Sequence, residues 1–74
     1  MENIILEKRQ KVAEIIQRKR IQKGFSQEQL AEKVGFARNT IARIENSRFS
    51  PNADQLYLIL AALQISFEID GEKI

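Results

Sequence analysis

The residues best suited to binding chemistry fall within one short stretch: Arg38, Asn39, Thr40 and Arg43. An arginine can bridge O6 and N7 of guanine, an asparagine can bridge N6 and N7 of adenine, and a threonine methyl can touch thymine. At about 100° of rotation per helical residue, Asn39 and Arg43 point away from the apolar pair Ile41 and Ile44. This pattern indicates hydrogen bonding to nucleic-acid bases. The alternative is an ordinary solvated helix surface.

Two short helices joined by a turn are needed to present these side chains on one face. Ser26 is a good N-cap and Gln29, three residues later, completes a capping box, so a helix is predicted from there through Lys33. Gly35 then allows the positive φ that a tight turn between packed helices often requires. A second helix over residues 38–46 completes a helix-turn-helix, a motif whose second helix enters the major groove of duplex DNA.

Side chains around this motif are expected to hold the DNA backbone rather than to read bases. They are polar or cationic residues at the start of the first of these helices and after the second: Gln27, Asn46, Ser47 and Arg48. Backbone amides at a helix start also bind phosphate. Ala37 has no oxygen to cap the second helix, so this position either leaves amides free for phosphate or places a methyl group against thymine.

A long first helix is predicted to precede the motif. It begins between Asn3 and Lys8 and ends at Lys23, because Gly24 can take the left-handed conformation that terminates many helices. The apolar run 4–6 could start this helix or form a short strand. The buried stripe of the helix is expected to contain four residues: Ile5, Val12, Ala13 and Ile16.

A fourth helix is predicted to follow, capped by Asn52 with Gln55. Its apolar residues at helical spacing are Leu56, Ile59, Leu60 and Leu63. The period then changes to two, and apolar residues alternate with polar ones at Ile65, Phe67 and Ile69. This alternation predicts a strand over residues 65–70.

The predicted strand has no obvious partner in the chain. Because unpaired backbone groups must be satisfied, we expect the strand to pair with its copy in a homodimer, with Ile65, Phe67 and Ile69 as dimerisation residues. Two alternatives remain for this segment. Ser66 could cap a short fifth helix, or Asp70 and Gly71 could turn the chain into a hairpin with residues 72–74.

Composition limits the classes of function that are open to this chain. Its 74 residues suit one domain, divided here into an extension of the first helix (1–11), a helix-turn-helix core (12–64) and the strand (65–70). The chain contains neither Cys nor His, which argues against structural zinc and against the usual catalytic nucleophiles and bases. We therefore expect no enzyme activity, cofactor or metal. Without a membrane-spanning apolar run or a secretory signal, cytoplasmic location with the nucleoid is expected.

Charge is distributed unevenly along the chain. The formal net charge is +2, but residues 1–23 carry +4, residues 24–52 carry +1 and residues 53–74 carry −3. A basic front and an acidic rear suit a protein that presents one side to a polyanion. The alternative is a set of ordinary solvated helix faces.

Residues 19–35, continued by residues 40–46, closely resemble the Cro/C1-type (Xre family) helix-turn-helix regulators of bacteria and phages. The resemblance covers about residues 12 to 65. It implies a mainly α, four-helix, lambda-repressor-like domain that regulates transcription by binding double-stranded DNA, usually as a dimer on a palindromic operator. It also implies a partly buried ion pair between Arg20 and Glu45.

Two parts of the chain depart from phage repressors of this family. The first ten residues extend beyond the common domain, and the alternating tail replaces the usual fifth helix. A helix-turn-helix followed by one strand resembles the antitoxin subunits of certain toxin-antitoxin operons. The resemblance therefore implies either a repressor or an antitoxin that neutralises a toxin protein and regulates its own operon.

Overall fold

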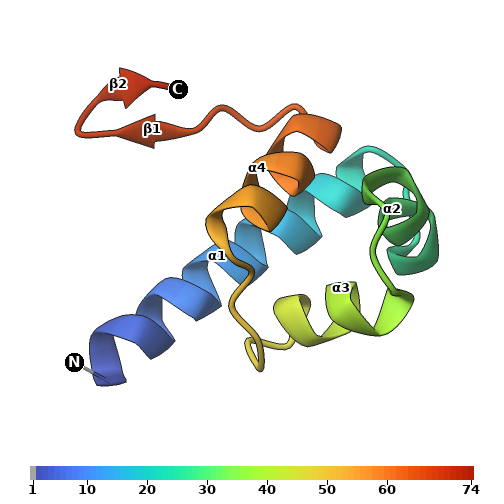
Figure 1. Cartoon of the computed structure of the whole chain (residues 1–74), viewed down its shortest axis with the longest axis horizontal. Coiled ribbons are helices and arrows are strands. Elements are labelled where there is room, and N and C mark those ends of the chain that lie inside the picture. Colours follow the sequence, from blue (N-terminus) through green and yellow to red (C-terminus); the bar gives the residue numbers. More distant parts are fainter. Residues whose placement is uncertain (1) are drawn as a thin grey trace.

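Four helices and one β-hairpin follow one another along the chain (Figure 1). The structure, a computed structural model, describes residues 2–74. Its elements have these bounds: α1 Glu2–Gln22, α2 Gln27–Val34, α3 Arg38–Glu45, α4 Ala53–Ala62, β1 Glu68–Ile69 and β2 Glu72–Lys73. The predicted mainly α fold with a helix-turn-helix is therefore confirmed.

α1 begins earlier than predicted, and its first turns are exposed. The helix starts at Glu2, so the apolar run 4–6 is helical and does not form a strand. The sequence places Ile5 in the buried stripe, but 50% of its surface is exposed. In Figure 1 this end of α1 projects beyond the helices that cover its middle. The buried stripe therefore starts further along α1, at Ala13 and Ile16.

Capping boxes begin α2 and α4, as the sequence predicts. Ser26 Oγ accepts a hydrogen bond from the backbone N–H of Gln29 at 3.0 Å, and the Gln29 side chain accepts one from the backbone N–H of Ser26 at 2.8 Å. Asn52 and Gln55 form the same reciprocal pair at 2.8 and 3.0 Å. Each box satisfies two backbone N–H groups that lack a partner within the helix, which fixes where the helix begins.

All four helices are followed by a residue with a positive φ. The backbone N–H of the residue after it donates a hydrogen bond to the carbonyl five residues before that donor, at 2.8 to 3.1 Å. This arrangement is the Schellman motif. The four residues with positive φ are Gly24 (78°), Gly35 (79°), Ser47 (61°) and Gln64 (56°). A Cβ on Gly35 would meet no atom within 4 Å. The strain predicted for a bulkier residue there therefore comes from the backbone angle and not from crowding.

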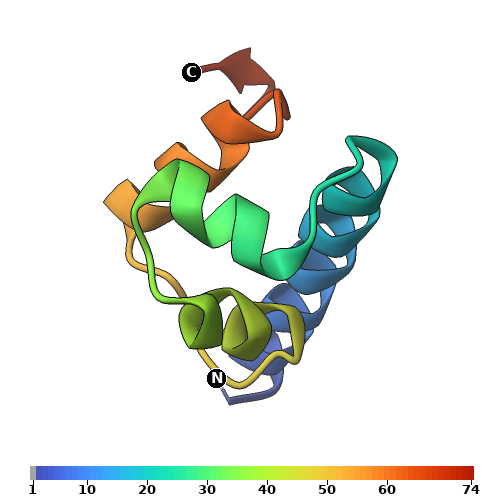
Figure 2. The same ribbon diagram turned by 90° about the vertical axis from the view of Figure 1, so that its right-hand side faces the viewer.

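The core lies where the four helices meet. α3 packs on α1 and α2, and α2 also packs on α4. The largest fully buried side chains are Ile16, Leu30, Ile41, Ile59 and Leu63. The predicted core positions of α3 and α4 are buried, except for Leu56, which is half-buried. Figure 2 shows α3 at one end of the molecule and the hairpin at the opposite end. The side of α3 that faces away from the core is exposed.

The C-terminal segment is a hairpin, so the single strand predicted over residues 65–70 is wrong in extent and in pairing. β1 is antiparallel to β2 of the same chain, and Asp70 (φ 53°) and Gly71 (φ 80°) connect them. An Asp-Gly pair favours a turn in which both central residues need a positive φ. The hairpin alternative holds, and the reason for seeking a partner strand in another chain no longer applies.

The three alternating apolar residues differ in their contacts and in their burial. Ile65 packs against the core, because the left-handed Gln64 turns the chain back toward α4. The ring of Phe67 meets Tyr57 edge to face, with centroids 5.8 Å apart. Ile69 is 57% exposed. The period of two in the sequence therefore reflects three different environments.

Candidate nucleic-acid interface

α2 and α3 form the helix-turn-helix, with residues 35–37 between them. Ile41 and Ile44 are 0% and 2% exposed, and their burial fixes the rotation of α3 about its axis. The opposite side of α3 therefore faces solvent. This is the side on which the sequence places most of its base-reading residues.

The exposed side of α3 carries three of the four predicted base readers. Arg38 and Asn39 lie in the first turn and Arg43 lies in the last turn, all exposed, whereas Thr40 is half-buried. Glu45 is the acidic residue of α3 and is only 8% exposed. The exposed positions of this helix are therefore neutral or cationic, which suits contact with a polyanion.

Arg43 has an aromatic partner that the sequence analysis missed. Its guanidinium carbon lies 5.1 Å from the centroid of the Phe49 ring, within the range of a cation–π interaction. Phe49 is half-buried and packs against the hydrophobic core. The left-handed Ser47 between them sets the path of the loop. No spacing rule in the sequence predicts that path.

The end of α3 carries three of the predicted phosphate-contacting residues. Asn46 and Arg48 are exposed and Ser47 is half-buried. Further along the same loop, Ser50 Oγ accepts a hydrogen bond from Arg9 Nε at 2.6 Å. This hydrogen bond ties the loop to α1. It also places Arg9, a cation outside the predicted site, beside the loop.

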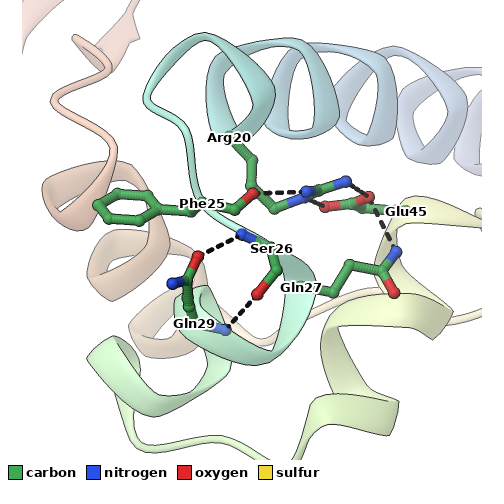
Figure 3. Close-up of polar contacts among 6 residues, drawn as sticks. All are labelled: Arg20, Phe25, Ser26, Gln27, Gln29 and Glu45. Atoms are coloured by element: carbon green, nitrogen blue, oxygen red, sulfur yellow. Dashed lines mark hydrogen bonds and ion pairs between the residues drawn. The ribbon is translucent and has the colours of Figure 1, made fainter.

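A buried ion pair joins α1 to α3 beneath this surface (Figure 3). Arg20 Nε and Nη2 donate to the two carboxylate oxygens of Glu45 at 2.7 and 3.1 Å, and Nη1 donates to the carbonyl of Phe25 at 2.7 Å. Gln27, the fourth predicted phosphate-contacting residue, donates from Nε2 to Glu45 Oε1 at 3.1 Å. The expected pair between Arg20 and Glu45 is therefore present, and it also engages Gln27.

Comparison with known proteins agrees with this geometry. A helix-turn-helix family model matches residues 16–69, from the last third of α1 to the end of β1. The chain belongs to the Cro/C1-type (Xre) helix-turn-helix family. It is 41% identical over 49 residues to an "Uncharacterized HTH-type transcriptional regulator" of Methanothermobacter thermautotrophicus, a match that covers 66% of this chain and 71% of the relative. No solved structure matches the chain.

This Cro/C1-type protein is a DNA-binding transcriptional regulator. The family match begins at residue 16, so the first turns of α1, including Arg9, lie outside it. Residues 2–74 of the regulator include no helix that is both long and apolar enough to cross a membrane. The same residues hold no group of three or more Cys, His, Asp or Glu side chains placed to bind a metal ion.

Proposed function

We propose that this Cro/C1-type regulator is a sequence-specific repressor that binds a palindromic operator as a homodimer, in the cytoplasm on the nucleoid. The observation that carries the proposal is the exposed face of α3, which presents Arg38, Asn39 and Arg43 and no exposed acid. In a dimer, two copies of α3 would read half-sites about 34 to 36 Å apart. This function needs no catalytic step and no cofactor.

Base reading is assigned to α3. Arg38 and Arg43 can each make paired hydrogen bonds to guanine, and Asn39 can do the same to adenine, with discrimination of about 1 to 3 kcal/mol for each good pair. Thr40 can touch a thymine methyl, although its partial burial shortens its reach.

Phosphate contacts are assigned to the two ends of the motif: Gln27, Asn46, Ser47 and Arg48. The Gln27 amide nitrogen carries two hydrogens, and its bond to Glu45 uses one of them. The second remains available for a phosphate oxygen at the start of α2. These contacts set the register of the protein on DNA and carry no sequence information directly.

Uncovered apolar side chains at the hairpin support the homodimer. Ile69 and Ile74 are 57% and 68% exposed, and a cavity of about 640 Å³ between α4 and the hairpin is lined in part by Phe67. Ile65, also assigned to dimerisation from the sequence, packs on its own core. We therefore assign the dimer contact to Phe67, Ile69 and Ile74.

A second candidate function is that of an antitoxin subunit, which binds and neutralises a toxin and regulates its own operon. Three apolar cavities of about 260, 130 and 640 Å³ favour it, because they follow one another from the start of α1 to the hairpin and neighbouring cavities share lining residues. Val12 and Leu56 line both the first and the second cavity, and Ile65 and Phe67 line both the second and the third. Such a row of apolar cavities suits an amphipathic segment of another protein.

Selection of bound duplexes from a random-sequence pool tests the leading proposal. We expect the pool to converge on an inverted repeat, and the logarithm of the binding constant to fall linearly with the logarithm of salt concentration. A pool that stays random after repeated selection would contradict the proposal. For the second candidate, we expect the product of a neighbouring gene to co-purify in a fixed ratio and to lose its toxicity in the complex.

A further inference from the structure

We propose that Phe49 is a positioning residue that orients the guanidinium of Arg43 and thereby sets specificity at the base pair that Arg43 reads. This inference rests on the proposed reading of DNA by α3. It adds a residue outside the helix-turn-helix to the determinants of sequence preference, and this residue need not touch DNA.

Phe49 is well placed to orient Arg43 because its ring is held in place by the fold, whereas the side chain of Arg43 is free to rotate. The ring is half-buried and packs against the hydrophobic core, so it is held by the fold. The Arg43 side chain is exposed, and its guanidinium carbon lies 5.1 Å from the ring centroid. A flexible cation that rests on a fixed aromatic face loses much of its rotational freedom before it meets a ligand.

The loop after α3 places the ring under Arg43 through backbone hydrogen bonds. The N–H of Ser47 bonds to the carbonyl of Ile44 at 3.0 Å, and the N–H of Arg48 bonds to the carbonyl of Arg43 at 2.9 Å. The positive φ of Ser47, 61°, lets the chain turn back along α3 in this way. The residue after this turn is Phe49, which therefore lies beside the last turn of the helix.

Stacking on the ring is compatible with reading a base. A guanidinium stacks through its face, whereas its N–H groups lie in its plane and point outward as a fork. The same fork makes the paired hydrogen bonds to O6 and N7 of guanine. A ring that contacts the face of the Arg43 group therefore leaves the in-plane donors free for the DNA.

The test measures Kd for a duplex selected by the wild-type protein and for its single-base-pair variants. Discrimination is the ratio of the Kd for a single-base-pair variant to the Kd for the selected duplex. In Phe49→Leu and Phe49→Met, which lack the ring but keep apolar bulk, we expect this ratio to fall about three- to tenfold at one base pair of each half-site. Discrimination at the other base pairs and the salt dependence of binding should remain as in wild type. Phe49→Tyr, which keeps the aromatic face, should retain wild-type discrimination.

Phe25 offers a matched control. It is also half-buried against the core and also lies under a cation, with Lys33 Nζ 5.5 Å from its ring centroid, but it lies outside α3 and its loop. Phe25→Leu should therefore keep the discrimination of wild type. Equal discrimination in Phe49→Leu and wild type would overturn the inference, as would weakening by the same factor at every base pair.

A second readout needs no DNA. In the free protein, the ring current of Phe49 should shift the NMR signal of the Arg43 Nε–H group, and Phe49→Leu and Phe49→Met should abolish that shift while Phe49→Tyr retains it. An unchanged signal in all three variants would overturn the inference. If the wild-type protein selects no sequence, the proposed function fails. If it selects one and the Phe49 variants read it equally well, only this inference fails.

Discussion

Arg20 and Glu45 carry opposite charges in the interior of the protein, with only 9% and 8% of their surfaces exposed. Two hydrogen bonds join them, Arg20 Nη1 donates to the carbonyl of Phe25, and Gln27 donates to Glu45 Oε1. Removing one member of such a pair leaves the other charged and buried without a counter-charge. The stability of the domain should therefore depend strongly on either residue.

We predict that Glu45→Ala lowers the free energy of unfolding by about 3 kcal/mol, which in a domain of this size lowers Tm by roughly 15 °C. Thermal and urea denaturation followed by circular dichroism would measure both quantities. Glu32→Ala is the matched control, because Glu32 is an exposed acid on α2. Equal shifts in the two variants would show that the buried pair has no special role.

Single residues differ in how far their roles could be predicted from the sequence. Ile41 and Ile44 could be placed in the core, because helical periodicity alone determines which side of α3 is apolar. The contact between Arg43 and Phe49 could not be predicted, since it depends on the path of a loop. Ile5 has the right spacing for burial, but periodicity does not indicate where neighbouring helices end.

At the scale of elements, the three shorter helices begin in two different ways. α2 and α4 each start with a complete capping box, whereas the N-cap of α3 is Ala37, whose methyl group accepts no hydrogen bond. Ala37 nevertheless has the extended backbone of an N-cap, with φ −68° and ψ 144°. The conformation needed for a side-chain cap is therefore already present.

We predict that Ala37→Ser and Ala37→Asp each raise the free energy of unfolding by about 1 kcal/mol, because their oxygens can accept hydrogen bonds from the first turn of α3. Urea denaturation would measure the gain. The two variants should differ on DNA, because an Asp beside Arg38 places negative charge on the surface that faces phosphate, and its Kd should rise above that of Ala37→Ser. If neither variant has a higher free energy of unfolding than the wild-type protein, the missing side-chain cap does not limit the stability of α3.

The helix starts and the hairpin differ in how well local chemistry determines them. Ser26 with Gln29 and Asn52 with Gln55 are reciprocal pairs close in sequence, so their structure follows from residue types. In the tail, alternation from residue 65 onward suggests one long strand. The left-handed Gln64 and the turn at Asp70 limit β1 to two residues. Both are backbone states that non-glycine residues adopt infrequently.

At the scale of the whole molecule, the chain separates two surfaces. Figures 1 and 2 both show α3 and the hairpin at opposite ends of the molecule, and the exposed cations Arg38 and Arg43 belong to α3. Residues 53–74, which form α4 and the hairpin, carry a net charge of −3. This separation suits a protein that binds DNA at one end and another protein chain at the other.

We predict that the double variant Ile69→Lys with Ile74→Lys is monomeric, because two cations would need to be buried at the proposed dimer contact. Light scattering at a fixed protein concentration would measure the mass. Ile21→Lys is the matched control, since Ile21 is 61% exposed on α1 and lies outside the proposed contact. An unchanged dimer in the double variant would exclude the hairpin as the contact between subunits.

The central claim is that α3 reads the base sequence of duplex DNA, and a matrix of Kd values tests it most directly. Wild type, Asn39→Ala and Arg48→Ala would each be titrated with the selected operator and with its single-base-pair variants. We predict that Asn39→Ala loses about 1 to 3 kcal/mol of discrimination at one base pair per half-site, whereas Arg48→Ala weakens all sites alike and reduces the salt slope by about 1. If Asn39→Ala keeps every preference of the wild-type protein, α3 does not read bases in the way described.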